Sequence, residues 1–377
     1  MRNKQTKNLL ILYLAALLLL LPAAFYTYKH PEYNFDMVGY MALIIKMDQK
    51  GSVEEIHKAT YSELRRSLSA DEYSRLTETA PHRKKFEADY SEFEKVLPNY
   101  IVKPLYLWTC WLFYKSGISL VTSTVLPSII SFLFLGLLLF HWLSKYLNAV
   151  IALTGTTLIM NSTFVTWIAR LSTPDLLSSV FLLASFYFIL EKRNPLWMFV
   201  LFLLAILSRA DNVILCFFII LFLTFSKKWK TLNLKQFFAM SASFAITYLF
   251  IVLPVRQFGW SIFFYSEYVK HIDYSRDFDQ PITLISHLSY MYRKLLSAFI
   301  SSHFTLFAFL GLLVFNRNVS LKDLSFDQTF LLLLSSVCVL KFLLLPDISD
   351  RFYIGFYLTI IILLIRKFFP KISTSTL

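Results

Sequence analysis

A small set of charged residues lies at the ends of apolar runs, where these residue types could do chemistry. Asp36 lies in an aromatic stretch, Lys103 precedes a short apolar run, and Asp175 begins a longer one. A carboxylate close to a membrane can be partly desolvated and made more basic, which suits a general base. A lysine at the depth of the lipid headgroups can pair directly with a phosphate. We therefore expect Asp36 to be a candidate base and Lys103 a candidate phosphate ligand.

Further charged residues interrupt or follow other apolar runs. They are Arg209, Asp211, Lys341, Asp347, Asp350 and Arg351. Arg351 is a second candidate for pairing with a phosphate. Lys341 lies inside an apolar run, where an ionisable residue often marks a functional site.

Each candidate also has a purely structural alternative, which the residues alone leave open. Asp175 can be an ordinary carboxylate at a helix start, where the helix dipole favours a negative charge. Lys103 can extend to lipid headgroups, and Arg209 can form an ion pair with Asp211. Asp347 and Asp350 can be solvated loop residues.

The sequence contains no recognisable metal or nucleotide motif. Its seven histidines show neither HxxxH nor HExxH spacing, and no Walker loop, GxGxxG or GxSxG sequence occurs. Cys110, Cys216 and Cys338 are far apart and lie in apolar runs, as buried hydrophobic residues do. We therefore expect no cofactor, and no metal site is indicated, although a carboxylate–histidine site that uses His30 or His271 stays open.

Apolar helices are expected to carry these residues. Of the 377 residues, 56% are hydrophobic and only 16% are charged, whereas an average soluble protein has roughly 25% charged residues. Soluble domains could not bury so much apolar surface, and 8 Gly and 12 Pro are too few for a collagen-like or low-complexity chain. We predict an all-α polytopic membrane protein in which residues 1–377 form a single transmembrane domain.

The predicted spans number about ten, because a helix needs about 20 apolar residues to cross a bilayer. They are residues 8–26, 119–142, 147–164, 173–190, 237–255, 295–315, 329–345 and 352–365, and two short spans within 196–225. A turn at Arg209 separates the short pair, because two charges at the middle of a bilayer would cost about 2.5–3.5 kcal/mol each. The apolar run 101–114 is shorter, which favours a helix at the interface or a re-entrant segment. The first run could instead be a signal peptide, but the many later spans favour an uncleaved helix.

The charge pattern predicts an orientation. The net charge is +13, no nucleic-acid motif accompanies it, and the short basic clusters fall at alternate ends of the predicted spans. We therefore expect a multi-pass protein of the plasma (inner) membrane with both termini cytoplasmic, membrane lipids as neighbours and no nucleic-acid partner. Residues 28–103 then form a helical outer loop, with surface helices at 53–68 and 86–97, and residues 256–294 form a second outer loop.

Four motifs together resemble the C-type integral-membrane glycosyltransferases, the branch of the protein O-mannosyltransferases and aminoarabinose transferases. The first is Asp36 followed by Gly39 and Tyr40, soon after the first span. The others are Lys103-Pro104-Leu105-Tyr106-Leu107-Trp108 with Gly117-Ile118-Ser119 and Leu126-Pro127-Ser128, then Thr173-Pro174-Asp175, then Leu207-Ser208-Arg209-Ala210-Asp211-Asn212. They cover residues 8–225 in the family's order, whereas the C-terminal half is similar only in hydropathy.

The resemblance implies an inverting transfer of a sugar from a polyprenyl-phosphate-linked donor to a glycan, lipid or protein acceptor on the outer face. Asp36 would take the acceptor proton, and Lys103 would bind the leaving phosphate with help from Arg209 or Arg351. Asp175, Asp211, Tyr40 and Asp350 would position the acceptor or the first outer loop. Met37 and Val102 stand where relatives place further acids, which argues against a bound metal.

Two other functions stay open. A transporter or flippase of lipid-linked glycans would need charged residues inside its spans, and Lys341 is the main candidate. A non-catalytic assembly or anchoring subunit would tolerate joint replacement of Asp36, Lys103 and Arg351.

Overall fold

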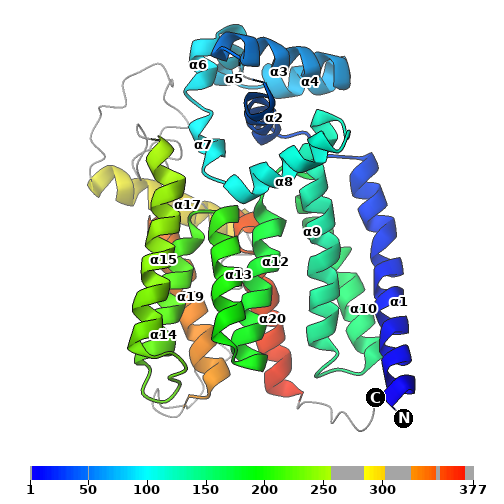
Figure 1. Cartoon of the computed structure of the whole chain (residues 1–377), viewed down its shortest axis with the longest axis vertical. Coiled ribbons are helices and arrows are strands. Elements are labelled where there is room, and N and C mark those ends of the chain that lie inside the picture. Colours follow the sequence, from blue (N-terminus) through cyan, green and yellow to red (C-terminus); the bar gives the residue numbers. More distant parts are fainter. Residues whose placement is uncertain (1, 50, 256–283, 302–323, 345–348, 370–377) are drawn as a thin grey trace.

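The computed structural model describes residues 2–49, 51–255, 284–301, 324–344 and 349–369. This part of the chain consists of helices and the turns between them, and its β structure is a single isolated bridge between Glu32 and Leu171. Long helices form a bundle, and short helices form a layer across one end of it (Figure 1). The all-α prediction is confirmed for the described residues.

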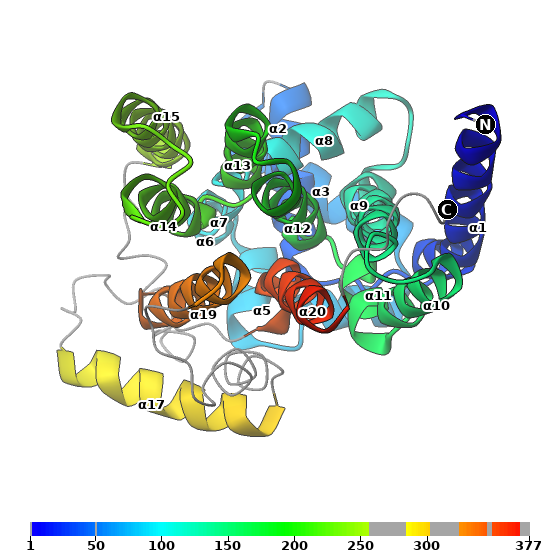
Figure 2. The same cartoon turned by 90° about the horizontal axis from the view of Figure 1, so that it is seen from below.

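The bundle contains the helices that run along its long axis. They are α1 (Arg2–Lys29), α9 (Leu120–Leu143), α10 (Ala149–Met160), α11 (Thr163–Arg170), α12 (Asp175–Tyr187) with the π-helical turn η1 (Phe188–Lys192), α13 (Pro195–Ser208), α14 (Asn212–Phe225), α15 (Leu234–Val252) with the short η2 (Leu253–Val255), α19 (Phe326–Leu344), and α20 (Ile354–Phe368) after the short η3 (Asp350–Phe352). Helix α12 lies at the centre, where it packs against α9, α13 and α20 (Figure 2).

The layer across the end of the bundle is made of short helices, and we call it the cap (residues 35–101). It contains α2 (Phe35–Asp48), α3 (Val53–Ser67), α4 (Ala70–Thr77), α5 (Pro81–Ala88), α6 (Tyr90–Glu94) and α7 (Pro98–Ile101). Helix α8 (Pro104–Lys115) joins the cap to α9, and α17 (Leu284–Ser301) lies across the bundle axis (Figures 1 and 2).

Four described helices are long and apolar enough to cross a membrane: α1, α9, α15 and α19. The pair α10–α11, bent by 57°, would be a fifth if it forms one broken span. Helices α13 and α14 are apolar but shorter. Large apolar side chains such as Leu18 and Phe250 are exposed on α1 and α15, as expected on a lipid-facing surface. These helices support a membrane-embedded protein, whereas the number of about ten spans remains a prediction.

The loops with basic clusters gather at one end of the bundle. The turns after α9, α12 and α14 lie at the end opposite the cap, together with the start of α1 and the end of α20 (Figure 1). These segments carry Lys145, Lys192, Arg193 and the lysines at 227, 228 and 230. The cap and the basic loops are therefore on opposite sides of the bundle.

An ion-pair network holds this basic end together. The Arg366 guanidinium on α20 donates to Asp327 on α19 at 2.8 and 3.1 Å and also contacts Glu191 of η1. The Glu191 carboxylate accepts further hydrogen bonds from Trp142 (3.0 Å) and Tyr146 (2.5 Å). Three donors therefore converge on Oε1 of this buried carboxylate, and the network fixes α9, α12, α19 and α20 relative to one another.

The cap has its own small hydrophobic core around α2. Nine consecutive residues of this helix, Met37–Ile45, are buried because α3, α7, α8 and α9 surround it. Ser52 and Ser69 begin α3 and α4 with capping boxes, each of which satisfies two backbone or hydroxyl donors. At Gly39 the ring of Tyr100 lies so close that a Cβ atom would be 2.1 Å from it. A side chain at position 39 would therefore force the two elements apart.

One sequence prediction about the cap is wrong in detail. The predicted helix 86–97 is broken, because Asp89 ends α5 and its side chain accepts a hydrogen bond from the Ser91 amide at 2.8 Å to begin α6. The predicted boundary between a loop to residue 294 and a span from 295 falls inside the continuous helix α17, and the second outer loop remains a prediction. Residues 256–283 and 302–323, which hold the rest of both predictions, lie outside the described residues.

Two segments far apart in the sequence run side by side beneath the cap. The Glu32 amide donates to the Arg170 carbonyl at 3.0 Å, and the Ser172 amide donates to Asn34 Oδ1 at 3.2 Å. Asp36 follows the first segment by two residues, and Asp175 follows the second by three. This pairing brings both carboxylates to the junction of cap and bundle.

Candidate functional site

Asp175 is the buried centre of a cluster of charged side chains. It is the first residue of α12, after Pro174, and its side chain is 1% exposed. Ser128 on α9 donates to the carbonyls of Leu171 and Thr173 at 2.8 and 2.9 Å, and so fixes the turn that leads into the helix. Asp175 is thus a carboxylate at a helix start, as one of the two interpretations of the sequence predicted. Its side chain also contacts two arginines.

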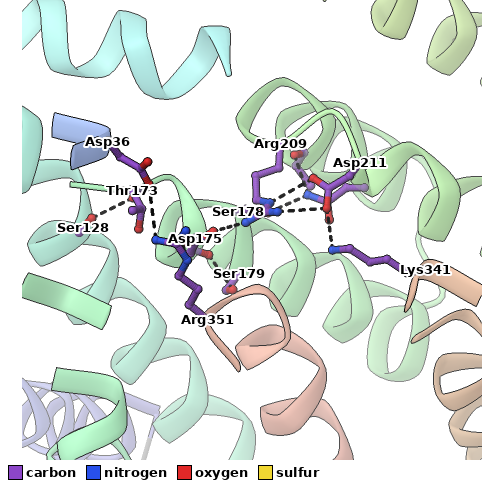
Figure 3. Close-up of polar contacts among 12 residues, drawn as sticks. Asp36, Ser128, Thr173, Asp175, Ser178, Ser179, Arg209, Asp211, Lys341 and Arg351 are labelled. Atoms are coloured by element: carbon purple, nitrogen blue, oxygen red, sulfur yellow. Dashed lines mark hydrogen bonds and ion pairs between the residues drawn. The ribbon is translucent and has the colours of Figure 1, made fainter. Parts of the chain in front are cut away.

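Arg209 is the first of these arginines, and it links Asp175 to Asp211. It lies in the turn between α13 and α14, which confirms the predicted break at this residue. Its guanidinium contacts Asp175 Oδ1 and donates to both Asp211 oxygens at 3.1 and 3.2 Å. Lys341 of α19 completes the chain, with its Nζ 2.7 Å from Asp211 Oδ2 (Figure 3).

Arg351 is the second arginine, and it joins Asp175 to Asp36. Its Nη1 is 3.5 Å from Asp36 Oδ2, and its Nε is 3.6 Å from Asp175 Oδ2. Figure 3 shows the Arg351 side chain reaching up from its own segment between the two carboxylates. Asp36 and Arg351 are 26% and 24% exposed, whereas Arg209, Asp211 and Lys341 are between 6% and 12% exposed. Solvent therefore reaches the cluster at Asp36 and Arg351.

One aromatic ring, that of Phe352, lies close to three positive charges of the cluster. The guanidinium carbons of Arg209 and Arg351 lie 4.0 and 4.9 Å from the centre of the Phe352 ring, and Lys341 Nζ lies 6.0 Å from it. Cation–π attraction of this kind contributes about 0.5–2 kcal/mol per contact, depending on exposure. Phe352 thus holds three cations near one another while the carboxylates balance their charge.

Lys103 approaches the same cluster from the cap side. Its Nζ lies 5.5 Å from the ring centres of both Tyr40 and Tyr100, which face it from α2 and α7. Burial lowers the pKa of Lys103, and the Asp36 carboxylate offsets part of this effect. Asp175, Arg209 and Arg351 also act on its charge. The structure therefore brings together Asp36, Lys103, Asp175, Arg209, Asp211 and Arg351, which were selected from sequence.

Two of the predicted positioning residues lie at the border of the cluster. Tyr40 is fully buried, and its ring lies beside Lys103 and packs against Tyr106 at 4.7 Å between ring centres. Asp350 accepts a hydrogen bond from Tyr357 at 2.7 Å, which fixes the turn before α20 that carries Arg351. Both residues therefore support neighbouring residues of the cluster, Tyr40 beside Lys103 and Asp350 in the turn of Arg351.

Sequence reasoning missed the partners that complete the cluster. The pairing of Lys341 with Asp211, the Phe352 ring, and the hydrogen bond from Asn212 Nδ2 to Ser178 Oγ (2.7 Å) were not predicted. A lone lysine in an apolar helix needs a carboxylate partner, so Lys341 carried a usable signal. Phe352 and Asn212 had no comparable signal, because Phe and Asn are common near helix ends.

The remaining candidates do not form a metal site in the described part of the chain. Among those residues, no group of three His, Cys, Asp or Glu side chains could hold a metal ion. His30 stacks on Tyr26 at 4.6 Å and contacts its carbonyl at 3.2 Å. His271 and Asp347 lie outside the described residues.

Comparison with known proteins gives no family. No family model, curated protein or solved structure matches this chain. Any assignment of activity therefore depends on the charge cluster itself and on the sequence motifs that surround it.

Proposed function

We propose that the chain is a membrane glycosyltransferase of the C type, which moves a sugar from a polyprenyl-phosphate-linked donor to an acceptor hydroxyl. The observation that carries this proposal is the asymmetry of the three clustered carboxylates. Asp175 and Asp211 are buried in close ion pairs, whereas Asp36 is partly exposed and its ion pair with Arg351 is longer, at 3.5 Å. A base must be accessible to its substrate and not committed to a strong ion pair.

The chemistry assigned to the cluster is a single displacement. The acceptor oxygen attacks the anomeric carbon while Asp36 takes its proton, a C–O bond forms, and the bond from that carbon to the phosphate oxygen breaks. The leaving electron pair stays on the polyprenyl phosphate. Because attack and departure occur on opposite faces of the sugar, the anomeric configuration inverts.

Lys103 and Arg351 are the residues proposed to bind the donor phosphate. Both lie beside Asp36, and a phosphate that pairs with Arg351 would compete with the Asp36 carboxylate for its guanidinium. Donor binding would thus free the base and neutralise the charge that develops on the leaving group. Arg209 is too committed to Asp175 and Asp211 to do more than stabilise the arrangement.

The proposal includes an orientation in a plasma (inner) membrane. About ten spans, cytoplasmic termini and an outer cap would place the charge cluster at the outer surface. The basic loops at the end opposite the cap support this orientation, because basic residues favour the cytoplasmic side.

A flippase of lipid-linked glycans is the second candidate, and the buried Lys341–Asp211–Arg209 chain favours it. Intramembrane ion pairs of this kind often lie on transport paths. In this case the donor would cross the bilayer with its sugar–phosphate bond intact.

One assay separates the two functions. The full chain is placed in proteoliposomes with a panel of radiolabelled polyprenyl-phosphate monosaccharides and an envelope extract as the source of acceptors. A transferase releases polyprenyl phosphate and labels a component of the extract. Movement of intact donor between leaflets, without bond cleavage, would instead support the flippase and contradict the proposal.

A further inference from the structure

A polar cavity lies at the contact between α1 and the cap. Its volume is about 480 Å³, and it is lined by the end of α1, the segment 30–33, α4, α5 and the end of α11. Figure 1 shows α1 rising toward the layer that contains α4 and α5. The cavity is therefore at the depth where the proposed lipid-facing helix meets the cap.

The cavity walls are predominantly basic. Four basic side chains and two acidic ones line it, which gives a net charge of +2 with His30 neutral. The acids are already engaged: Glu32 pairs with Arg170 at 3.0 Å, and Glu72 accepts hydrogen bonds from the Ser69 amide and hydroxyl at 2.9 and 2.7 Å.

Three of the basic residues differ from Arg170, which pairs with a carboxylate. Within the described part of the chain, Lys29, Arg75 and Arg83 form no ion pair. The Arg83 guanidinium is held in place by hydrogen bonds from its Nη1 to the Arg75 carbonyl (3.3 Å) and to Thr79 Oγ1 (3.0 Å). Its Nε is nevertheless buried without a partner among the described residues. Arg83 also lines the cavity, so its positive charge is available there to an anion without the displacement of a carboxylate from an ion pair.

The surroundings indicate which anion fits. Phe25, Tyr26 and Tyr28 on the last turns of α1 are 63%, 50% and 46% exposed, as in the aromatic belts at membrane surfaces. Lys29 Nζ lies 5.6 Å from the Phe25 ring, so it is placed at the edge of this aromatic surface. Arginines and lysines at that depth bind the phosphates of lipid headgroups.

We propose that this cavity binds a phosphate group, with Lys29, Arg75 and Arg83 as its ligands. The site is separate from the charge cluster and does not depend on the activity proposed for it. The ligand is a phosphate mono- or diester. The molecule that carries this phosphate is either a membrane lipid or a soluble phosphate compound. Because the segments 30–36 and 170–175 connect the cavity to Asp36 and Asp175, a bound phosphate would also hold the two segments together.

The test uses the full chain purified in detergent and the double variant Lys29→Gln/Arg75→Gln. Both residues are exposed and free of ion pairs in the described residues, so the variant is expected to fold like the wild type. Lys58→Gln/Lys84→Gln is the matched control, since it removes the same charge from exposed cap positions outside the cavity. Native mass spectrometry measures retained phosphatidylglycerol, with phosphatidylcholine as the zwitterionic comparison, and thermal unfolding measures stabilisation by inorganic phosphate.

The two sources predict different results. If a lipid is the ligand, the cavity variant binds phosphatidylglycerol about thirty-fold more weakly than the wild type, because each basic residue near an anionic surface contributes about 1 kcal/mol. If the source is soluble, inorganic phosphate raises the unfolding temperature of the wild type and of the control, but not of the cavity variant. The proposal is overturned if the cavity variant and the control behave alike in both measurements.

Discussion

At the scale of single residues, the cluster divides into side chains that hold it and side chains that remain accessible. Asp175, Arg209, Asp211 and Lys341 form a buried chain of ion pairs, and each has at least one close partner of opposite charge. A buried charge is tolerated only when it is paired, so these four residues are required for the arrangement. Their loss should therefore reduce stability before it affects any chemistry.

Asp175→Asn tests this structural role. The substitution removes the charge that lies between Arg209 and Arg351, and we expect unfolding stability to fall by about 3 kcal/mol, as for a broken buried pair. Thermal unfolding in detergent measures the change. Asp71→Asn, on the exposed face of α4, is the control and should leave the unfolding temperature nearly unchanged. Equal stability of the two variants would show that the ion-pair chain does not stabilise the fold.

Lys103 gives a prediction on pH dependence. Burial lowers its pKa, so it loses its proton as pH rises at a value below the roughly 10.4 of a free lysine. If its charge binds the donor phosphate, transfer falls on the alkaline side of the pH profile. Lys103→Arg keeps the positive charge over the whole pH range. The fall in transfer rate at alkaline pH should therefore move to higher pH when each rate is expressed relative to the variant's own maximum rate. An unchanged profile in Lys103→Arg, with Lys84→Arg as the control, would exclude Lys103 as the titrating group.

The cluster could be predicted from sequence as a set, but its pairings could not. Charges that adjoin apolar runs are expensive in lipid, so they must be brought together or to the membrane surface. Asp36, Asp175, Arg209 and Arg351 can be selected from the sequence on this ground. The pairing of each carboxylate with an arginine depends on the side-chain positions that α19 and α20 set. Hydropathy contains no information on those positions.

At the scale of elements, hydropathy predicts helices well within the bundle and poorly inside the cap. Helices α9, α12, α15 and α19 coincide with predicted apolar runs, and the break at Arg209 follows from the cost of charge in lipid. Helix α2 was not predicted, because burial on all sides removes the periodicity that marks an amphipathic helix. The division of α5 from α6 depends on one capping residue, Asp89, which composition does not reveal.

Gly39→Ala tests how the cap is joined to the site. The new Cβ would be 2.1 Å from the Tyr100 ring, and overpacking of this kind costs about 1–3 kcal/mol. We expect a lower unfolding temperature and faster proteolysis within the cap. Gly155→Ala is the control, because no atom lies within 4 Å of the added methyl group.

A second substitution makes this test specific. Tyr100→Ala in the Gly39→Ala background removes the ring and should restore part of the lost stability relative to Tyr100→Ala alone. If the stability losses of the two single variants simply add in the double variant, the glycine at position 39 is not required for the contact between α2 and α7.

At the scale of the whole molecule, the cap and the basic loops occupy opposite ends of the bundle, which predicts sidedness. Ser91 in the cap and Thr231 in the loop between α14 and α15 are both exposed, and the native cysteines are all buried. We expect Ser91→Cys to react with a membrane-impermeant maleimide in intact cells. Thr231→Cys should react only after the membrane is permeabilised. The reverse pattern would place the cap in the cytoplasm and remove the proposed site from the outer face.

The central claim is that Asp36 takes a proton during transfer rather than holding the cap in place. The direct measurement is the single-turnover rate of sugar transfer with the donor already bound, in the wild type and in Asp36→Asn. A general base contributes about 10²- to 10⁴-fold, so the rate should fall by that factor while the unfolding temperature stays close to that of Asp71→Asn. Donor affinity should not fall, because the substitution removes the carboxylate that competes with the donor phosphate for Arg351. A rate in Asp36→Asn equal to that of the wild type would contradict the account.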